Sequence, residues 1–594
     1  MYRLFEKLNL PVIGRWFILG TIVGVVAGLG AIVFFMFLQF SSFIFIDYIA
    51  GMRLQETAGE PLLFPHATTE FKRWLLVLIP AFGGLVSGIL VYSLAPEAEG
   101  HGTDAAIDVI HKKKGFIRLR VPFIKTLASA ITIGTGGSGG REGPIAQIGA
   151  GFGSLLGRLL YLSDREKRIL TSAGMGAGIG AIFRSPVAGA IFAAEVLYAS
   201  SDMEYEILLP STITSIVAYS VFCSMFGWSP LFSTPDFFFA RPIELISYTI
   251  LGFSCALVGY IYINVFYGIN DLFKKLRIPN HVKPMIGGLL TGIIGYFIPE
   301  ALGGGYAQIE KAMYLELGVF FLLLLLVAKI LTTSFSIGSG GSGGIFGPSV
   351  VIGAALGGFV GIALNKISPI LVSEPGAFVI VGMAGFFAGI AKTPLSTIIM
   401  VSEMTGNYHL LVPSMWVSTL SFLTLGRTTI YKKQEMSRSD SPIHRGEFLL
   451  HILEDIKIKD VMRKDPLVIN ENMKFMDIVN FIPTTKHNSF PVVSKNNTLI
   501  GVLRFEEIRE FIFEKELENI IVASEVCDKK SPSVMPEDTL SQAIEIIGFS
   551  NIELLPVTNN HTEKILVGII TRRDIIANYN KEMIKQKQHL QVEF

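Results

Sequence analysis

Charged residues and cysteines are scarce in this sequence. Only 17% of its 594 residues are Asp, Glu, Lys or Arg, and the net charge is +1, whereas a soluble domain carries about 25% charged residues. The three cysteines lie far apart, which excludes a disulfide framework or a CxxC metal site. No HExxH motif and no cluster of Cys and His ligands occurs, so nothing indicates an enzyme, a bound metal or a required cofactor. The charge balance gives no argument for a nucleic-acid partner either.

Long apolar runs fill most of the chain instead. A helix needs about 20 apolar residues to cross the hydrocarbon of a lipid bilayer. Several runs here are shorter and are interrupted by glycine, which favours tilted or broken membrane helices. The runs cover residues 16–40, 74–94, 208–226, 246–265, 284–297 and 317–331.

The ends of the apolar region are polar and basic. Arg3, Lys7 and Arg15 precede the first run, which is too long for a secretory signal, so we expect the N-terminus to be cytoplasmic in a plasma or inner membrane. After Gly426 a basic stretch leads into a region with frequent charges and short strand-like runs, which predicts a soluble cytoplasmic domain. The limits that we expect are a membrane domain at 1–435 with repeats at about 70–225 and 245–426, a linker at 436–455, two small domains at 456–522 and 523–580, and a tail at 581–594.

The membrane region contains an internal repeat. Residues 133–144 read IGTGGSGGREGP and residues 337–348 read IGSGGSGGIFGP, so nine of the twelve positions match. Downstream, Gly-Met precedes Pro186 and Pro394 by twelve residues, and Glu195 and Glu403 follow those prolines by nine. Transporters built from two such halves place their sites at the repeat interface on broken helices.

Each glycine-rich segment ends in Gly-Pro before an apolar helical run. Proline favours the first position of a helix, so Pro144 and Pro348 predict two helix starts. Free N–H groups at such ends carry the positive end of the helix dipole, and a partly dehydrated anion can satisfy them. The alternative is that the glycines only allow close packing of helices. No segment ends in Gly-Lys-Ser/Thr, which disfavours a phosphate-binding P-loop.

The repeats differ at their most polar position. Arg141 and Glu142 stand where the second repeat has Ile345 and Phe346. An ionisable residue at membrane depth is a functional candidate, and the Glu142 carboxylate can compete with an anion for the same N–H donors. Protonation would remove its charge and release it, which makes Glu142 a proton-sensitive gate. The alternative is that Glu142 merely pairs with Arg141.

The tail also repeats. Residues 465–469 parallel 531–535, residues 490–493 parallel 555–557, and residues 501–503 parallel 568–570. Each copy predicts a short unit of helix and strand that packs on the other copy.

At this point the chain resembles the CLC chloride channel and transporter family followed by two CBS domains. The matching segments are GHGTD (100–104), GREGP (140–144), GGIFGP (343–348) and Tyr431, in the order that the family shows. The resemblance implies an α-helical polytopic membrane domain with inverted repeats and tilted, broken helices, followed by a cytoplasmic α+β tandem CBS domain. It also implies a homodimer in the lipid bilayer that passes chloride or a similar small anion.

The resemblance also assigns residues. Glu142 would be the gating glutamate, and Lys125 matches an intramembrane lysine of the family. The expected anion-binding residues are His101, Gly102, Arg141, Glu142, Gly143, Ile345, Phe346, Gly347 and Tyr431.

Two positions depart from the family. His101 stands where a chloride-contacting serine is common, so it either holds the anion and alters selectivity or is a polar residue at a helix start. Val196 stands where proton-coupled exchangers often carry an internal glutamate, and Glu195 is its neighbour on a possible proton pathway. Valine there favours a channel-like protein gated by protonation of Glu142, and the alternative is a proton-coupled chloride antiporter.

The CBS resemblance implies a ligand. Adenine nucleotides such as ATP or AMP often bind between paired CBS units, and the second copy ends in a segment where Thr571 would lie near the phosphates and Asp574 would hold the ribose. In the first copy Glu507 replaces that aspartate. The alternative is a CBS pair that only stabilises the protein.

Overall fold

The computed structural model describes residues 12–53, 57–67, 69–444, 453–454, 456–485, 487–509, 521–560 and 562–592. The chain divides into two units, Met1–Pro442 and Ile443–Phe594, which we describe separately. Arg3, Lys7 and residues 445–452 of the expected linker lie outside the described residues.

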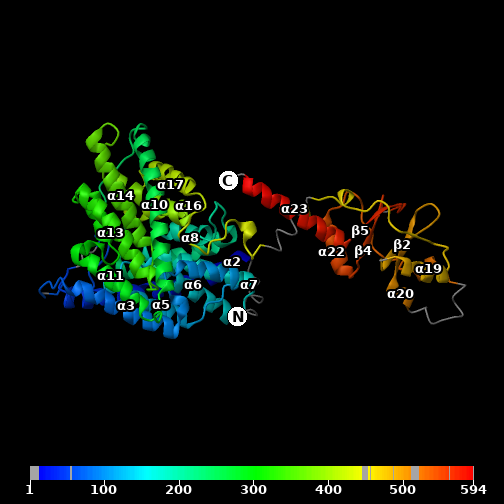
Figure 1. The fold of residues 1–594 in the computed structure, drawn as a ribbon, viewed down its shortest axis with the longest axis horizontal. Coiled ribbons are helices and arrows are strands. Elements are labelled where there is room, and N and C mark those ends of the chain that lie inside the picture. Colours follow the sequence, from blue (N-terminus) through cyan, green and yellow to red (C-terminus); the bar gives the residue numbers. More distant parts are fainter. Residues whose placement is uncertain are drawn as a thin grey trace. The chain divides into compact units, whose positions relative to one another are not determined.

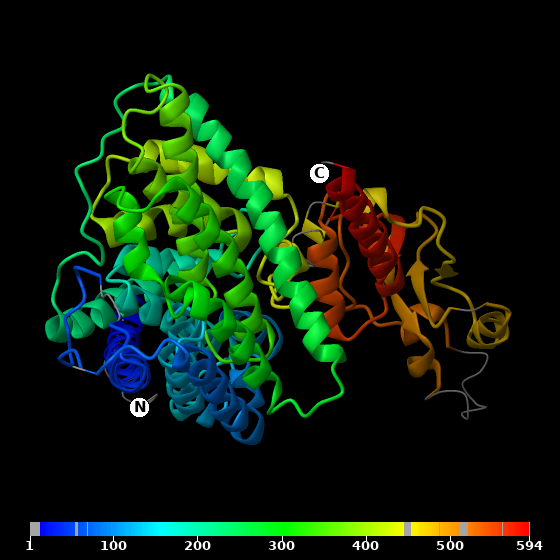
Figure 2. The ribbon, with the colours of Figure 1, turned by 60° about the vertical axis from the view of Figure 1, so that its left-hand side comes forward.

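The first unit is helical, and its helices come in two series with the same order (Figures 1 and 2). A long helix opens each series, and short helices of 8 to 12 residues recur at the third and seventh positions. The first series is α2 (Val12–Ser42), α3 (Leu75–Leu94), α4 (Thr103–Lys112), α5 (Arg120–Gly134), α6 (Glu142–Leu159), α7 (Asp164–Ile182), α8 (Pro186–Glu195) and α9 (Tyr205–Phe226). The second series is α10 (Glu244–Lys275), α11 (Lys283–Phe297), α12 (Tyr306–Met313), α13 (Val319–Gly338), α14 (Phe346–Ile367), α15 (Ala377–Ala391), α16 (Pro394–Thr405) and α17 (Leu411–Leu425).

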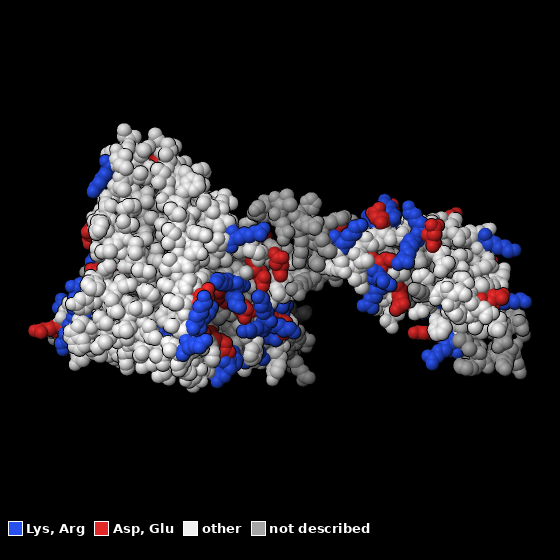
Figure 3. Space-filling model, in the orientation of Figure 1, with Lys and Arg blue, Asp and Glu red and all other residues white. Residues whose placement is uncertain are grey.

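Among the described residues, six segments are long and apolar enough to cross a membrane. Helices such as α10 turn large apolar side chains outward, and Phe253 and Leu257 are 52% and 63% exposed. Figure 3 shows a broad face of this unit, over α10, α11 and α13, that is almost bare of Lys, Arg, Asp and Glu among the residues described. Such a surface is stable only against lipid or another apolar surface, so this unit is an integral membrane domain. The six segments are Gly14–Ile49, Leu75–Leu94, Tyr205–Phe226, Glu244–Lys275, Val319–Gly338 and Phe346–Ile367.

Some of the glycines do serve close packing. A methyl group at Gly149 of α6 would lie 2.1 Å from the carbonyl oxygen of Gly174 in α7. The second series repeats this contact, because a methyl group at Gly353 of α14 would lie 2.5 Å from the carbonyl oxygen of Gly382 in α15. Small residues allow membrane helices to approach this closely, so each series fixes its central helix pair in the same way.

The second unit contains two small sheets. Strands β1 (Ile469–Asn470), β2 (Ser489–Val493) and β3 (Leu499–Arg504) form one sheet, in which β1 is parallel and β3 antiparallel to β2. Strands β4 (Leu554–Thr558) and β5 (Leu566–Thr571) form an antiparallel pair. The accompanying helices are α19 (Phe475–Phe481), α20 (Phe505–Arg509), α21 (Ala523–Val526), α22 (Leu540–Ser550) and α23 (Arg572–Val592).

The two cores of this unit exchange their leading segments. Ile458, which precedes the first sheet, packs in the core around α22 and β4 with Leu540 and Leu555. Val526, which precedes the second sheet, packs in the other core with Phe490 and Leu503. Each copy therefore buries part of the other.

Candidate anion-binding site

The two glycine-rich segments meet in the middle of the first unit. The Gly140 N–H donates to the Gly344 carbonyl and the Gly344 N–H donates to the Gly140 carbonyl, each at 2.7 Å. This antiparallel bridge brings the first turns of α6 and α14 together. Two helix N-termini, each with free N–H groups and a positive partial charge, therefore converge on one buried place.

The helices begin earlier than we predicted. α6 starts at Glu142 and α14 at Phe346, so Pro144 and Pro348 are the third residues rather than the first. Proline is tolerated there because the first four N–H groups of a helix have no partner inside the helix. The shift places Glu142 itself on the first turn.

Glu142 occupies the N-terminus of the opposite helix. Its side chain is buried, and its Oε1 accepts the Gly347 N–H of α14 at 2.6 Å. Its Oε2 accepts the Tyr306 hydroxyl at 3.3 Å. The carboxylate is thus bound where a free anion would find the same donors.

Arg141 points away from Glu142. Its guanidinium donates to Glu60 and lies 4.9 Å from the centre of the Tyr306 ring. The alternative that Glu142 only pairs with Arg141 does not describe this geometry. A cavity of about 290 Å³ reaches Glu60, Arg141 and Tyr306 from the side of the 57–67 loop, so these residues separate Glu142 from an open vestibule.

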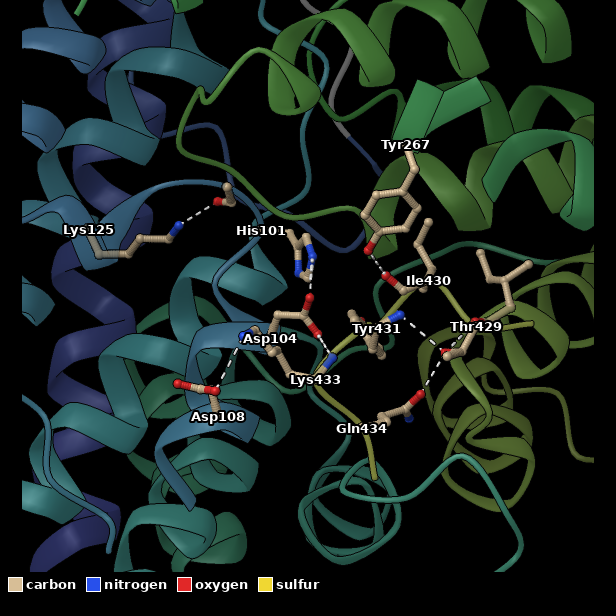
Figure 4. Close-up of polar contacts among 12 residues, drawn as sticks. His101, Asp104, Asp108, Lys125, Tyr267, Thr429, Ile430, Tyr431, Lys433 and Gln434 are labelled. Carbon is tan, nitrogen blue, oxygen red and sulfur yellow. Dashed lines mark hydrogen bonds and ion pairs between the residues drawn. The ribbon is translucent and has the colours of Figure 1, made fainter. Parts of the chain in front are cut away.

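His101 lies on the other side of the bridge, where α4 begins. Gly102 is the N-cap of α4 with φ of 80°, a left-handed conformation that favours glycine. His101 is buried, with 8% of the residue exposed, and its Nε2 lies 3.4 Å from Asp104 Oδ2. Its Nδ1 is buried and has no hydrogen-bond partner among the described residues. Figure 4 shows the imidazole above the Asp104 carboxylate.

His101 and Gly102 also contact the first turn of α6. A methyl group at Gly143 would lie 1.9 Å from the His101 carbonyl oxygen, and one at Gly102 would lie 2.5 Å from the Gly143 carbonyl oxygen. The starts of α4, α6 and α14 are therefore in contact. Ile345 and Phe346 are buried at the start of α14. The Phe346 ring meets the Phe387 ring edge to face, with their centres 4.4 Å apart.

Tyr431 follows α17 and faces His101. Its ring centre lies 5.5 Å from that of His101, and its side chain is 1% exposed. Its backbone N–H donates to Thr429 Oγ1, which in turn donates to Gln434 at 2.6 Å (Figure 4). The Gln434 amide donates to the carbonyls of Val196, Tyr198 and Ala391. This network fixes Tyr431 beside His101, on the side of the candidate site that follows α17.

Two buried lysines hold the loops before α4 and α12. Lys125 Nζ donates to the carbonyls of Ala98 and Gly100 at 3.0 and 2.7 Å. Lys329 Nζ donates to the carbonyls of Ala301 and Gly303 at 3.1 and 2.7 Å. Our sequence analysis noted Lys125 but missed Lys329 and Tyr306. The signal was a second repeat, because Pro-Glu-Ala followed by glycines occurs at 96–102 and at 299–305.

Glu195 and Glu403 cap each other's helices. Glu195, at the end of α8, accepts the N–H groups of Leu395 and Ser396 at the start of α16, at 2.9 and 2.8 Å. Glu403, in α16, accepts the Ser185 hydroxyl at 2.7 Å and the Ala188 N–H at 3.1 Å at the start of α8. Both carboxylates thus bind helix N-termini across the repeat interface.

In the second unit, Asp574 already has partners. Arg463 donates to its Oδ1 at 2.7 Å, and the Thr571 hydroxyl donates to its Oδ2 at 2.6 Å. Burial alone would raise the pKa of Asp574, but the hydrogen bonds from Arg463 and Thr571 outweigh it and hold that pKa below its usual value. In the first copy Glu507 stands in place of Asp574 and lies 3.7 Å from Arg504, which also donates to Asp528 at 2.9 Å. An ion pair therefore occupies the Asp574 carboxylate, where a nucleotide ribose was expected.

The first unit has two helical series whose helix N-termini converge, and a pair of small α/β modules follows it in the chain. These features define a class of membrane transport protein with an anion-directed centre. The family described as "Voltage gated chloride channel" matches residues 83–426, more than half of the chain, and the CBS domain matches residues 458–514 and 523–581. The chain therefore belongs to the CLC family of anion transporters and carries two CBS domains. Both the predicted resemblance and the predicted fold class are confirmed.

Individual relatives agree. The putative chloride channel protein ClcB-like of Ralstonia nicotianae is 29% identical over 60% of this chain and 83% of its own length. The H(+)/Cl(-) exchange transporter ClcA of Vibrio cholerae is 30% identical over 62% of this chain and 82% of its own length. A crystal structure of a slow cyanobacterial Cl-/H+ antiporter superimposes with a TM-score of 0.61 at 24% identity, over 70% of this chain and 96% of that chain, and at this identity it supports the fold alone.

Proposed function

We propose that this protein exchanges chloride, or a similar small anion, for protons. The observation that supports this most directly is that the Glu142 carboxylate is bound to the Gly347 N–H and the Tyr306 hydroxyl, in a place suited to an anion. A carboxylate that competes with the transported anion couples its own protonation to anion binding. The ClcA relative is described as an exchanger, and this supports exchange over the channel-like interpretation that Val196 favoured.

In this proposal Glu142 carries the proton. As a carboxylate it blocks the N-terminus of α14, because charge and hydrogen bonds hold it there. Once protonated it is neutral, it competes poorly for the N–H groups, and an anion takes its place. Arg141 remains paired with Glu60 and contributes positive potential from the outer side.

The anion would be bound by several donors in contact with one another. Backbone N–H groups at the helix starts and the two polar side chains on the inner side provide them. The proposed anion-binding residues are His101, Gly102, Gly143, Ile345, Phe346, Gly347 and Tyr431.

A proton pathway through Glu195 has little support. Its oxygens accept the N–H groups of Leu395 and Ser396, and this capping role uses the carboxylate in its charged form. The neighbouring Val196 offers a carbonyl to Gln434 but no titratable group. The exchange that we propose therefore needs another proton-transferring group on the inner side.

We also propose a homodimer with both termini in the cytoplasm, in a plasma or inner membrane, as the family resemblance implies. In the CBS pair an adenine nucleotide would meet Thr571 and Asp574, and it would have to displace Arg463 from the Asp574 carboxylate. Nucleotide binding that increases in the Arg463→Ala variant of the full-length protein would support this site.

Coupled flux in proteoliposomes tests the function. Purified protein is reconstituted, a chloride gradient is imposed, the membrane potential is clamped near zero, and internal pH is recorded. Uphill proton movement driven by chloride supports exchange. Chloride flux without proton movement would instead support a channel in which Glu142 is only a gate.

A further inference from the structure

The most unusual group at the centre is a buried imidazole with one free nitrogen. His101 is 8% exposed, its Nε2 faces Asp104 Oδ2 at 3.4 Å, and its Nδ1 has no hydrogen-bond partner among the described residues. Buried polar atoms in proteins normally have a partner. The free Nδ1 is therefore suited to a mobile ligand or a mobile proton.

The groups around His101 leave Asp104 as its charged partner. Lys125 of α5 is turned to the carbonyls of Ala98 and Gly100, and the hydroxyl of Tyr267 in α10 donates to the Ile430 carbonyl. Tyr431 stacks beside the ring without charge, and Phe266 of α10 covers another side at 6.5 Å. Glu99, two residues away, is hydrogen-bonded to Tyr92.

Asp104 is in turn held from the inner side. The Lys433 N–H donates to Asp104 Oδ1 at 3.1 Å, while Lys433 Nζ turns to Asp108 at 3.5 Å (Figure 4). The Asp104 side chain is 19% exposed and that of His101 only 9%. The partly exposed Asp104 carboxylate is therefore in contact with the buried His101 ring.

The His101 backbone contacts the residue that follows Glu142. The His101 carbonyl is packed directly against Gly143, the residue after Glu142. The Glu142 carboxylate and the imidazole therefore lie on neighbouring residues of two touching helix starts.

We propose that His101 and Asp104 form the inner proton-transfer pair of this exchanger, in place of the acid that is absent at Val196. This inference rests on the exchange proposed above. The neutral imidazole keeps the Nε2 proton that faces Asp104, takes up a second proton at Nδ1 from water on the inner side, and becomes an imidazolium that the Asp104 carboxylate stabilises. It then gives its Nδ1 proton to the Glu142 carboxylate, so the imidazole is neutral again and Glu142 becomes a neutral acid. For proton movement in the opposite direction the steps reverse.

The chemistry of both residues suits these steps. Imidazole titrates near neutral pH and can release a proton from one nitrogen while the other is held. A carboxylate that accepts from one ring nitrogen fixes the tautomer and favours the charged ring. An anion bound at Nδ1 and a proton transferred from Nδ1 would use the same place in alternation, which links the two fluxes.

The test compares variants in the proteoliposome assay. His101→Gln keeps an amide donor of similar size but cannot carry a proton, so we expect the number of protons moved per chloride ion to fall at least tenfold, whatever the change in chloride flux itself. Asp104→Asn keeps the shape but removes the charge, so the pH profile of proton flux should move to lower pH by about one unit or more, since an opposite charge at this distance shifts a titration by about 1 to 3 units. Asp108→Asn is the matched control, one turn further along α4 and paired with Lys113 and Lys433.

The outcomes separate the two proposals. If the wild-type protein moves no protons uphill, the exchange proposal is wrong and the pair has no role. If the wild-type protein and His101→Gln couple equally, the exchange stands and only the pair is refuted. If His101→Gln carries no chloride, Asp104→Asn decides, because a pH profile like that of Asp108→Asn would overturn the inference.

Discussion

The Tyr306 hydroxyl offers a sharp test of how Glu142 is held. It donates to Glu142 Oε2 at 3.3 Å, and its ring lies under the Arg141 guanidinium. The Tyr306→Phe substitution removes the hydroxyl, which is one of the donors to the Glu142 carboxylate, and leaves the packing of the ring in place. The other donor, the Gly347 N–H at 2.6 Å, remains.

The size of the effect follows from that bond. A hydrogen bond to a charged group contributes about 1.5–3 kcal/mol, and the long distance argues for the lower end. A loss of about 1.4 kcal/mol is a tenfold change in the balance between the charged, bound carboxylate and its protonated form, or about one pH unit. Since the lost donor favours the charged form, Glu142 should be released at a pH about one unit higher in the variant.

The assay is the pH dependence of chloride flux in proteoliposomes, with Tyr248→Phe as the control. Tyr248 of α10 is also a buried tyrosine, but its ring stacks on that of Phe378 in α15, with the ring centres 4.3 Å apart. We expect the flux midpoint to move upward only for Tyr306→Phe. An unmoved midpoint with normal maximal flux would show that Tyr306 does not hold the gate, and equal movement in both variants would point to general loosening.

Three further changes test other parts of the structure. Glu142→Gln should abolish proton coupling and the pH dependence of flux while anion flux continues, as measured by the same internal-pH recording; a proton-dependent variant would refute the role of Glu142. Glu403→Gln should lower the free energy of unfolding by about 0.5–2 kcal/mol, as is typical of a lost helix cap, and the thermal midpoint of the detergent-solubilised protein should fall accordingly. An unchanged midpoint would mean that the cap at Ser185 is redundant. Because the pKa of Asp574 is held low, by Arg463 and Thr571 against the opposing effect of burial, the stability that Asp574 contributes is present above the unfolded pKa of about 3.9 and is lost as pH falls through the lower folded value. The hydrogen-exchange protection factor of β5, which is the exchange rate of the unfolded chain relative to that of the folded protein at the same pH, should therefore fall at acidic pH in the wild-type protein and already at neutral pH in Arg463→Ala.

Much of the central site could be predicted because it is written in the repeat. Glycine-rich segments of matching sequence predicted two similar helix starts, and the difference between them singled out Glu142. The matching positions of Glu195 and Glu403 were also visible, since a glutamate follows proline by nine residues in each half, but the spacing did not predict that they cap each other's helices. We nevertheless interpreted Glu195 beside Val196 as a proton-pathway candidate, because spacing does not reveal which helix a carboxylate faces.

The partners of Glu142 and Arg141 could not be predicted from local sequence. Tyr306 stands 164 positions from Glu142, and Glu60 stands 81 positions from Arg141. Glu60 lies in no recognisable motif, and the repeated loop before Tyr306 does not indicate that the tyrosine hydroxyl faces Glu142. Their roles arise only when the two halves interlock, so the direction of the Arg141 side chain follows from packing rather than from its neighbours.

The two halves share a frame and differ at the residues that carry chemistry. In both, a buried lysine binds the carbonyls of a Pro-Glu-Ala loop, and a glycine with φ of 80° or 79° caps the short helix that follows. Within that frame His101 corresponds to Gly304, and Arg141 and Glu142 to Ile345 and Phe346. A symmetric frame alone would bind an anion equally from both sides. Placing a titratable ring in one loop and a carboxylate on one helix start makes the centre asymmetric, and in the exchange that we propose this asymmetry gives a proton one defined route past the anion.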